Sequence, residues 1–491
     1  MEDRVRTLLL ILLLTSMSTF LSGISHVNSE LRTWIVDDDG PADFRSIQQA
    51  VDQVNSGDII YVRSGTYREN VAIYKNLSLL GEEGAIVRAA NAGSAAFQIS
   101  VNNVNLTGFQ ITEACNGIFL QEAENCLVSN NTVFSSGCSE RGTGITLNFS
   151  DHNDIRENYV IEYCNGILLS DSNHNDIYDN TVQESNDVYD FAIFNSTDNM
   201  IVNNTIQGYK GFYTFYAGGN VLKNNTIGGS LPCPFIVSGV SLSDYLIDVD
   251  TSNTVYWRPI YYWINQKDKE IPSGAGMVVI VNSTNISVKN QNWVAVQFAY
   301  TNNSLIDNVD TFHTIGLHLY ESYNNTICES DLRENWGFPS RCNINLANST
   351  NNRFYHNNMD IPDAIIYKNE PGNLWDNDYP AGGNFWGNYN GTDFYNGPYQ
   401  NITGSDGIGD VPYVIGENNV DRYPLMYPHE GILGDVLHDG TVDIYDALVF
   451  ADVFNAMPSG PNWNPYADFN HDNAIDIFDA IILAGNFGKV A

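Results

Sequence analysis

The feature that most constrains this chain is a short block of sequence that recurs at nearly constant spacing. Blocks of equal length begin at Gly117, Gly144 and Gly166, and each closes on valine. Related blocks span 316–332 and 343–359. A short fixed repeat is the signature of a solenoid, in which each repeat forms one coil. The sequence therefore predicts a stack of similar coils of roughly 20–29 residues each.

Apolar and polar residues alternate inside these blocks. Such alternation is typical of strands and not of helices, and turns rich in Asn, Asp, Ser and Gly separate the strands. Both features predict a mainly β chain folded as a right-handed parallel β-helix. We align Asn125, Asn153 and Asn175 with one another. The aliphatic residues expected in the core columns include Leu127, Ile155, Ile177, Ile201 and Leu222.

A second set of asparagines recurs near the end of the blocks. An Asn side chain offers two donors and an acceptor, and Asn tolerates left-handed backbone angles better than most residues. A column of stacked asparagines can therefore satisfy the backbone amides at a bend shared by successive coils. We expect a structural role for this column, which comprises Asn131, Asn158, Asn180, Asn204 and Asn225.

The start of the chain, residues 1–29, has the pattern of a secretory signal. Arg4 and Arg6 precede the apolar run 8–14, which is too short to span a bilayer comfortably. No later stretch is long and apolar enough to span. We therefore expect the mature protein to be secreted or attached to the cell surface, with no transmembrane segment. The formal net charge of −36 argues against nucleic acid as a partner, because such partners need a basic face.

Asparagine and cysteine usage adds two smaller expectations. Sequons, for example at Asn105 and Asn148, are numerous, so an exported chain is expected to be a glycoprotein, although an Asn-rich and Thr-rich solenoid also forms sequons by chance. The seven cysteines are too sparse to build the fold from disulfides. Cys115 and Cys164 occupy equivalent coil positions and can pack as small apolar residues. One candidate bridge joins Cys328 to Cys342.

The first coils carry a recognisable opening segment. Apolar residues within 44–54 recur with a helical period, which predicts a short amphipathic helix inside an N-terminal cap at 33–56. The segment 43–73, DFRSIQQAVDQVNSGDIIYVRSGTYRENVAI, resembles the start of pectin-lyase-like β-helix proteins, including pectin methylesterases and NosD-type proteins. The resemblance implies a β-helix over 30–428.

Two later segments carry related resemblances. The segment 255–290 is similar to a stretch of NosD-type and other carbohydrate-associated β-helix proteins. It is rich in aromatic residues, which either pack in the core or stack on sugar rings. These aromatic residues are Tyr256, Trp257, Tyr261, Tyr262 and Trp263. The segment 383–427 resembles the closing part of many NosD-type proteins, which implies a C-terminal cap, followed by a linker at 429–433.

The most specific chemical signal is an acidic loop of about twelve residues that occurs twice within 434–491, each time followed by an apolar helical run. Oxygen ligands at loop positions one, three, five, nine and twelve, with a backbone carbonyl at seven, can surround calcium. The first loop offers Asp435, Asp439, Thr441, Asp443 and Asp446. The second loop offers Asp468, Asn470, Asp472, Ala474, Asp476 and Asp479.

This duplicated loop and helix resembles a type I dockerin. The resemblance implies two Ca²⁺ ions and a cohesin-type protein module as partner. It assigns the partner contacts to two apolar pairs, Ile444 with Tyr445 and Ile477 with Phe478. The first loop has Leu437 at position three, where it lacks a side-chain ligand, so we expect its calcium site to be the weaker one.

Acidic residues in the turns are the candidate catalytic residues. Lyases and hydrolases on this fold use grouped carboxylates, and such a group is formed by Asp151, Asp154, Asp171 and Asp176, with His152 and His174 beside it. We prefer to interpret them as solvated turn residues. The remaining histidines show no paired His/Met motif that would bring several metal ligands together. Those after the predicted signal segment are His313, His318, His356, His429, His438 and His471.

Taken together, these patterns predict a secreted β-helix protein that binds or processes extracellular polysaccharide and attaches to a cohesin-type partner through a dockerin. An enzyme of this kind would be a polysaccharide lyase or a glycoside hydrolase. One alternative is a non-catalytic adhesive scaffold at the cell surface. A second alternative, implied by the NosD resemblance, is a protein that handles copper.

Overall fold

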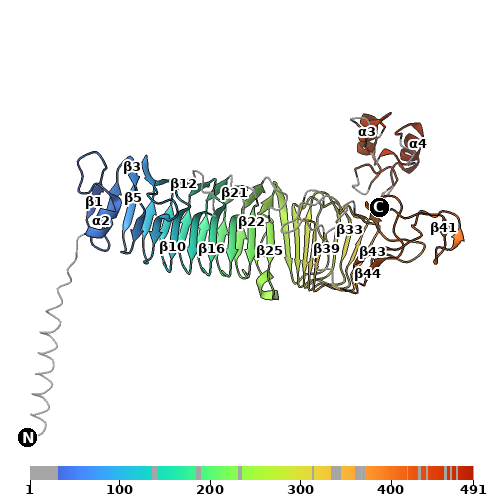
Figure 1. Ribbon diagram of the computed structural model, residues 1–491, viewed down its shortest axis with the longest axis horizontal. Coiled ribbons are helices and arrows are strands. Elements are labelled where there is room, and N and C mark those ends of the chain that lie inside the picture. Colours follow the sequence, from blue (N-terminus) through green and yellow to red (C-terminus); the bar gives the residue numbers. More distant parts are fainter. Residues whose placement is uncertain are drawn as a thin grey trace, which may run out of the picture.

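The computed structural model describes residues 31–134, 142–183, 189–208, 210–229, 235–311, 314–332, 344–359, 366–367, 371–416, 418–429, 433–437, 441–457, 462–464, 467–470 and 474–489. The predicted signal segment lies outside these residues. The described chain forms a long stack of short strands, followed by a small helical domain (Figure 1). Strands from successive coils pair in parallel along the stack, so the main body is a parallel β-helix, as predicted.

The first section of the stack has three sheets, and one of them continues into a second section. A ten-stranded sheet consists of β1 (Thr33–Val36), β2 (Ile59–Val62), β5 (Ser78–Gly81), β8 (Asn105–Thr107), β11 (Leu127–Ser129), β14 (Asp154–Arg156), β17 (Asp176–Tyr178), β20 (Met200–Val202), β23 (Val221–Lys223) and β26 (Asp248–Val249). An eight-stranded sheet consists of β4 (Val71–Ile73), β7 (Ala95–Ile99), β10 (Asn116–Gln121), β13 (Thr143–Asn148), β16 (Asn165–Ser170), β19 (Tyr189–Phe194), β22 (Phe212–Phe215) and β25 (Phe235–Ser238). The third sheet has fifteen described strands, β3 (Gly65–Arg68), β6 (Ala85–Arg88), β9 (Gln110–Thr112), β12 (Thr132–Phe134), β15 (Tyr159–Ile161), β18 (Thr181–Gln183), β21 (Thr205–Gly208), β24 (Thr226–Gly229), β27 (Thr254–Val255), β28 (Arg258–Ile264), β30 (Met277–Val281), β32 (Ala295–Ala299), β34 (Leu317–Tyr320), β36 (Ile344–Ala347) and β39 (Ile366–Tyr367).

The second section adds a sheet of its own and ends in a cap. The new sheet consists of β29 (Lys267–Glu270), β31 (Thr284–Gln291), β33 (Leu305–Val309), β35 (Thr326–Cys328) and β37 (Arg353–Tyr355). Short pairs follow, namely β38 (Asn358–Met359) with β40 (Phe385–Trp386), β41 (Tyr395–Asn396) with β42 (Ile402–Thr403), and β43 (Tyr413–Gly416) with β44 (Asn419–Asp421). A short 3₁₀ helix, η1 (Leu242–Tyr245), lies near the change of section. The helices are α2 (Ile47–Gln53), α3 (Ile444–Val453) and α4 (Ile477–Asn486).

The buried aliphatic columns lie where the sequence repeat predicts them, except in the first block. Ile155, Ile177 and Ile201 are partners in adjacent strands and are fully buried, as predicted. In the coil before them, Val128 and not Leu127 pairs with Ile155. Leu127 is only half-buried. Because strand side chains alternate between faces, a slip of one residue in the alignment moves every side chain to the opposite face.

The same slip affects the first predicted asparagine. Cys126, and not Asn125, lies next to Asn153, whose side-chain oxygen accepts a hydrogen bond from the Cys126 amide at 2.9 Å. Asn125 has a left-handed backbone with φ of 55°. A buried Cys thus fills the place that Asn fills in later coils.

The predicted asparagine column forms a continuous buried ladder. The backbone N–H of Asn158 donates to Oδ1 of Asn180 at 3.1 Å, and the N–H of Asn180 donates to Oδ1 of Asn204 at 3.0 Å. Each Nδ2 donates to the same Oδ1 and also to a backbone carbonyl. The ladder continues from Asn131 to Asn253. Each coil therefore satisfies a buried amide of the coil before it.

Other bends of the solenoid use the same device. One ladder runs through Asn153, Asn175, Asn199 and Asn220. In the second section, ladders run through Ser304, Asn325, Asn352 and Asn373 and through Ser330, Asn357 and Asn384. Serine at the first place of these two ladders shows that a hydroxyl can substitute for the amide.

Both ends of the solenoid are covered. At the N-terminal end, Ser46 caps α2, and Ile47, Ala50 and Val51 of this helix are buried against the first coils. This helix confirms the amphipathic pattern predicted within 44–54. Its position keeps water from the core of the first coil, as solenoid ends require.

At the C-terminal end, a cap closes the last ladder. Trp386 is buried and stacks on Tyr413 with ring centroids 4.4 Å apart. The fully buried carboxylate of Asp421 accepts hydrogen bonds from the Asn384 amide at 2.7 Å, the Trp386 indole at 2.9 Å and the Tyr423 amide at 3.0 Å. The predicted cap role of this segment is consistent with this packing. Asp421 takes the place that the next Asn would occupy.

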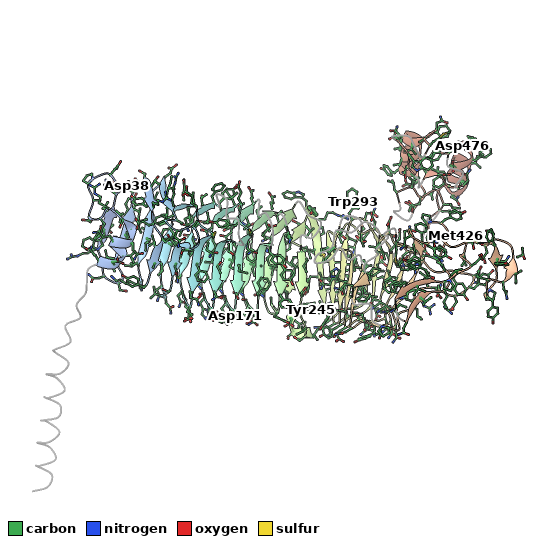
Figure 2. The ribbon with its side chains drawn as sticks, viewed as in Figure 1. Asp38, Asp171, Tyr245, Trp293, Met426 and Asp476 are labelled. Atoms are coloured by element: carbon green, nitrogen blue, oxygen red, sulfur yellow. The ribbon has the colours of Figure 1, made fainter. Side chains whose placement is uncertain are left out.

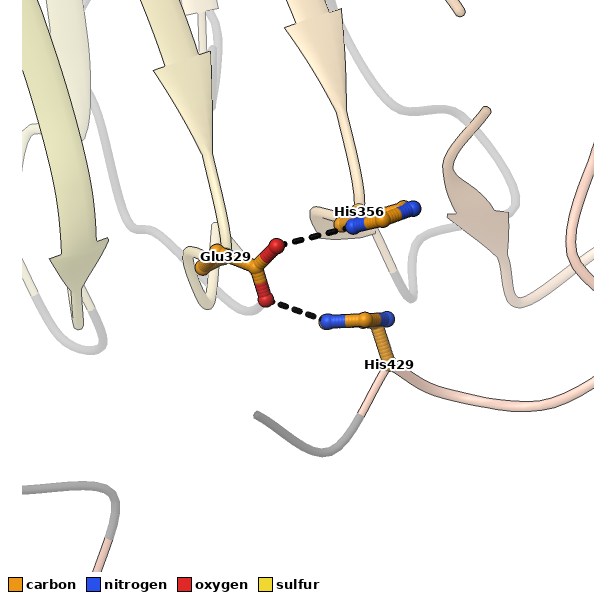
Figure 3. Close-up of side chains that lie close together, drawn as sticks. All are labelled: Glu329, His356 and His429. Carbon is orange, nitrogen blue, oxygen red and sulfur yellow. Dashed lines mark hydrogen bonds and ion pairs between the residues drawn. The ribbon is translucent and has the colours of Figure 1, made fainter. Parts of the chain in front are cut away.

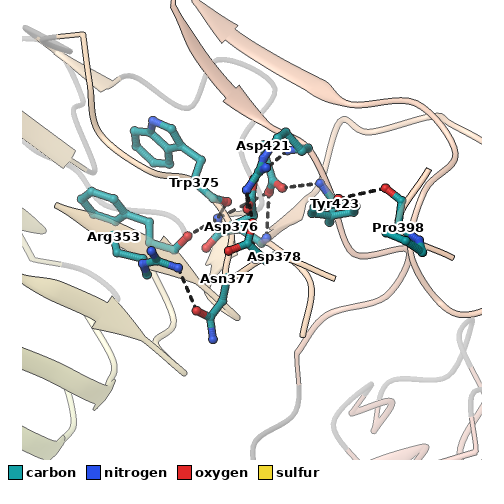
Figure 4. A network of polar contacts seen from close by, with 11 residues as sticks. Arg353, Trp375, Asp376, Asn377, Asp378, Pro398, Asp421 and Tyr423 are labelled. Atoms are coloured by element: carbon teal, nitrogen blue, oxygen red, sulfur yellow. Dashed lines mark hydrogen bonds and ion pairs between the residues drawn. The ribbon is translucent and has the colours of Figure 1, made fainter. Parts of the chain in front are cut away.

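A charged network fastens the cap to the chain before it (Figure 4). Arg422 donates through Nε and Nη2 to both oxygens of buried Asp376, at 2.9 and 2.5 Å, and through Nη2 to Asp378 at 2.5 Å. The indole of Trp375 donates to Asn419 at 3.0 Å. A two-pronged Arg–carboxylate contact of this kind fixes orientation as well as position.

The cysteines behave differently from the expectation. Cys115 is disulfide-bonded, whereas Cys126, Cys164 and Cys328 are free. The candidate bridge from Cys328 to Cys342 is therefore wrong. Cys115 and Cys164 occupy equivalent coil positions, but only Cys115 forms a disulfide.

Candidate functional site

The C-terminal domain is built from two equivalent loop–helix units. Helices α3 and α4 begin at equivalent N-caps, Asp443 and Asp476, and both form capping boxes. One residue of each loop forms backbone hydrogen bonds with the segment that follows the helix of the other unit. Val442 exchanges backbone hydrogen bonds with Gly488 and Lys489, and Ile475 does so with 455 and 456. The duplication in sequence is thus a duplication in structure.

The last acidic residue of each loop is buried in the same way. Asp446 accepts the amides of Leu437 at 3.0 Å and Asp443 at 2.8 Å. Asp479 accepts the amides of Asn470 at 3.1 Å and Asp476 at 2.8 Å. Both carboxylates are fully buried. Neither of them forms an ion pair with another described residue.

The first acidic residue of each loop, Asp435 or Asp468, is also buried. Buried carboxylates in turns are the donor set that a hard cation takes, so the described part of both loops fits calcium. Thr441 and Ala474, the residues predicted to offer backbone carbonyls, lie within the described chain. Asp439 and Asp472, the predicted position-five ligands, lie outside the described residues.

Each helix of the domain presents an apolar group to solvent. The residues predicted to contact a partner are all strongly exposed, and one more apolar residue on each helix joins them. The exposed fractions range from 56% to 62% over Ile444, Tyr445, Leu448, Ile477, Phe478 and Ile481. Exposed apolar residues gathered on equivalent faces typically mark interaction surfaces.

The four candidate catalytic aspartates do not share one set of contacts. Asp154 and Asp176 are direct neighbours in β14 and β17. Burial raises the pKa of Asp154, Arg156 at 3.6 Å lowers it, and Asp176 raises it further. Asp151 instead accepts the backbone amide of Asn173, in the following coil, at 2.6 Å. These contacts are those of turn and strand residues in any stacked coil.

Asp171 accepts hydrogen bonds from Ser170 in its own turn and from Asn195 in the next coil. A shallow depression of about 280 Å³ lies over the outer face near Asp176, lined also by Tyr178, Asp179, Met200, Val202 and Asn203. The rings of His152 and His174 stack at 5.0 Å. The predicted group is therefore a strand pair, Asp154 with Asp176, and two separate turn aspartates.

Single alanine variants of Asp151, Asp154, Asp171 and Asp176 should leave the fold intact. We expect each to change the free energy of unfolding by less than about 1 kcal/mol, because surface substitutions usually have small effects. Thermal melts of the four variants check this. Turnover on a polysaccharide panel is measured alongside, and unchanged turnover in all four would remove them as catalytic candidates.

The aromatic segment around residue 260 is divided between core and surface. Tyr262 is buried, and its hydroxyl donates to the Tyr245 carbonyl at 2.6 Å. Trp257 is 77% exposed and Trp293, on a nearby turn, is 66% exposed. Arg258 joins the two turns by donating to the carbonyl of Asn292 at 2.6 Å. Figure 2 shows Trp293 on the edge of the solenoid opposite Tyr245.

Both exposed tryptophans adopt left-handed backbone angles, with φ of 67° at Trp257 and 53° at Trp293. Left-handed residues recur at the turns of this solenoid, and the aromatic residues Phe149, Tyr216 and Tyr300 share this conformation. The two indoles are thus exposed side chains of turns, whereas Tyr262 packs in the core.

A histidine cluster at the end of the solenoid was missed by sequence reasoning. Glu329 lies between His356 and His429, and one carboxylate oxygen meets each ring (Figure 3). The His356 contact measures 2.8 Å, and the two rings stack at 4.1 Å. Burial raises the pKa of Glu329, but the hydrogen bonds from both histidines outweigh it and leave that pKa at about 2. His313, His438 and His471 lie outside the described residues.

His318 stands apart from that cluster and is mostly buried on the outer face of β34. Its Nε2 lies 3.1 Å from the Ile315 carbonyl. Burial lowers the pKa of His318 to about 4, and the hydrogen bond opposes this only in part.

This shift predicts a loss of stability in acid. The unfolded chain takes up a proton at His318 near pH 6.5, whereas the folded chain does so only near pH 4. The contribution of His318 is therefore complete above about pH 6.5 and is lost as the pH falls towards 4. We expect the loss to be on the order of 3 kcal/mol. Denaturant unfolding from pH 7 to 4 measures the fall in the free energy of unfolding. This fall should be smaller in His318→Gln than in the parent, and the exposed control variant His174→Gln should show the same fall as the parent. An equal fall in His318→Gln and the parent would contradict the assignment.

Comparison with known proteins places this geometry in context. Residues 51–256 match the family described as periplasmic copper-binding protein NosD. A "Cell surface glycoprotein" of Methanothermus fervidus is 33% identical over 129 residues, which is 26% of this chain and 20% of that protein. The match thus spans about a fifth of that relative's length. None of the helices in the described part of the chain has the length and apolarity that crossing a bilayer requires.

Several solved structures are similar at low identity. An alginate lyase from a Paenibacillus species is 14% identical, with 65% of this chain and 98% of that chain covered and a TM-score of 0.28. A Family 28 exopolygalacturonase from Yersinia enterocolitica is 10% identical, with 67% and 75% covered and a TM-score of 0.35. A DFA-IIIase from Arthrobacter chlorophenolicus is 13% identical, with 60% and 94% covered and a TM-score of 0.39.

The strand pairing within this chain shows a parallel β-helix protein, and residues 51–256 of that β-helix are similar to the NosD family.

Proposed function

We propose that this protein acts outside the cell, where its solenoid binds polysaccharide and its C-terminal domain, loaded with calcium, attaches it to a cohesin-type protein module. The observation that carries the proposal is the duplication in the C-terminal domain. Each of its two units combines buried loop carboxylates with an exposed apolar group on the following helix. The first feature suits Ca²⁺ and the second suits a protein partner.

Calcium would bind through each loop with unequal strength. The ligands would be Asp435, Asp439, Thr441, Asp443 and Asp446 in the first loop and Asp468, Asn470, Asp472, Ala474, Asp476 and Asp479 in the second. Asn470 supplies a side-chain oxygen where Leu437, which is 39% exposed, supplies none. Binding would tie the two ends of each loop together, and an unfolded chain has no preformed site, so metal binding and folding of this domain should be linked.

Calorimetric titration of the calcium-depleted full chain should show one tight and one weak site. Asp468→Asn should remove the tight site, and the matched variant Asp435→Asn should remove the weak one, because each deletes the same ligand from its own loop. The cohesin-type module should bind the loaded chain and lose at least tenfold in affinity when chelator is added or when Tyr445 and Phe478 are both replaced by Ala. A single class of equal sites, or a tighter site in the loop with Leu437, would overturn the assignment.

The polysaccharide part of the proposal rests on the exposed indoles of Trp257 and Trp293. Aromatic faces present large apolar surfaces on which sugar rings can stack. Affinity electrophoresis on a polysaccharide panel should show retardation of the parent that is lost when both residues are replaced by Ala. Tyr399→Ala, which removes an 82% exposed aromatic of the cap, serves as the matched control.

A non-catalytic adhesive scaffold is the second candidate. It is favoured by the engagement of Asp151 and Asp171 in hydrogen bonds to neighbouring turn residues and by the likeness to a protein named a cell surface glycoprotein. Retarded migration without turnover on any polysaccharide of the panel would support this candidate over a lyase or hydrolase. Copper handling, the third alternative, is favoured by the family match over 51–256 alone.

A further inference from the structure

The cluster of Glu329, His356 and His429 joins parts of the chain that are far apart in sequence. Glu329 directly follows β35, and His356 directly follows β37 in the next coil. His429 follows the cap and returns to the solenoid, where Asn358 holds it. The Asn358 side chain accepts the His429 amide at 2.7 Å and donates to its carbonyl at 2.8 Å. The position of His429 is therefore fixed by its backbone, independently of its ring.

The earlier coils show what this bend position usually holds. Asn290 and Asn308 occupy the equivalent places in β31 and β33, and Nδ2 of Asn308 donates to Oδ1 of Asn290 at 2.9 Å. Glu329 and His356 replace that amide pair in the next two coils, with the same left-handed backbone. An amide ladder needs no added ion, whereas a carboxylate facing two imidazoles offers a set of ligand atoms.

The hydrogen bonds of His356 require a cation between its ring and Glu329. Nε2 of His356 lies 2.6 Å from the Ala381 carbonyl, which can only accept, so Nε2 carries the hydrogen. In the neutral ring, Nδ1 then directs a lone pair at a Glu329 oxygen 2.8 Å away. Two acceptors at that distance need either a proton or a metal ion between them. A carbonyl that accepts from the distal ring nitrogen is also the usual outer partner of a metal-bound histidine.

A metal ion meets this need at all three groups at once. With protons alone, His356 must be a cation while a neutral His429 donates from Nε2, and the two rings stack with a centroid distance of 4.1 Å. One divalent ion leaves both rings neutral and still neutralises Glu329. The three ligand atoms already lie within 4.8 Å of one another. A tetrahedral zinc ion with bonds of about 2.0–2.1 Å needs its donors roughly 3.3 Å apart, so the carboxylate must move slightly away from the two rings to admit the ion.

We propose that Glu329, His356 and His429 form a binding site for a divalent transition metal of the zinc class. Two nitrogen donors and one carboxylate suit zinc and its neighbours better than calcium or magnesium, which prefer oxygen donors throughout. The ion would clamp the segment that leads to the C-terminal domain onto the last coils of the solenoid. The site is separate from the acidic loops and does not depend on them.

The test uses the full chain, made without a histidine tag, stripped of metal and then resaturated with calcium. Cobalt added to the parent should give visible absorption bands of a site with four or five ligands, saturating at one equivalent and displaced by zinc. Glu329→Gln and His429→Gln should each lose these bands, since each removes one ligand while the Asn358 contacts remain. His174→Gln, which alters the other stacked histidine pair, should keep them.

Hydrogen exchange gives a second readout. Zinc should slow exchange in peptides covering 424–429 of the parent and leave them unchanged in Glu329→Gln. The calcium titration of each variant reports its folding and separates failure of this site from failure of the proposed function. Cobalt bands that persist in both ligand variants, or a folded parent that gives no bands, would overturn the proposal.

Discussion

Replacing Ile177 by Asp should lower the free energy of unfolding by more than about 4 kcal/mol, enough to prevent stable folding of the central coils. Ile177 is fully buried between Ile155 and Ile201 in the core column. The variant loses the apolar contacts of Ile177 and forces a carboxyl group into a site that offers no partner, and both effects are costly. Chemical unfolding followed by circular dichroism measures the change.

The matched control is Met200→Asp in the next coil. Met200 is 48% exposed and adjoins Ile201 in β20, so the same new charge points to solvent. We expect a change below about 1 kcal/mol. Equal stability of Ile177→Asp and the parent would refute the inward orientation of this column.

Replacing Asn180 by Leu should cost about 3 kcal/mol or more. Oδ1 of Asn180 accepts the backbone N–H of Asn158 at 3.1 Å, and its Nδ2 donates to the carbonyl of Ile155 at 2.7 Å. Leucine has a similar size but leaves both backbone groups without this partner in a site that water does not reach. Each buried polar group deprived of its partner costs about 1–3 kcal/mol. The measurement is again the free energy of unfolding.

Asn180→Ser provides a graded comparison. Ser304 occupies an equivalent ladder place, where its hydroxyl accepts the Ile286 amide at 3.0 Å and donates to the Asn302 carbonyl at 3.0 Å. Serine at 180 should therefore retain part of the ladder and cost less than leucine. If serine and leucine proved equally destabilising, packing volume and not hydrogen bonding would explain the conserved geometry of the bend.

The coil repeat made most of the solenoid predictable, because strand pairing turns equal sequence spacing into spatial register. This worked for Ile155, Ile177 and Ile201, and for the asparagines beneath them. It failed in the first block because Asn125 resembled its later counterparts in type, whereas Cys126 occupied their place. The physical requirement at that place is a residue whose backbone amide donates to Asn153, and residue identity alone did not reveal it.

The histidine cluster marks the limit of the same reasoning. Glu329 and His356 are one coil apart, so register alone could have paired them. His429 could not be placed in this way, because the chain passes through the whole cap before Asn358 captures its backbone. Contacts of this kind depend on the path of an irregular segment, which carries no periodic signal. The acidic loops were easier to recognise, since their spacing is local and occurs twice.

The asparagine ladders also give the solenoid a direction, like a polymer with distinct ends. Each rung donates its backbone N–H to the side chain of the following coil, so a ladder always leaves one donor open at its far end. For the ladder ending at Asn384, that donor meets the carboxylate of Asp421. Asp421 belongs to β44 of the cap and not to a further coil. Asp421 thus ends this asparagine ladder. A solenoid that lost it would present a templating end to which the first coil of another copy could add.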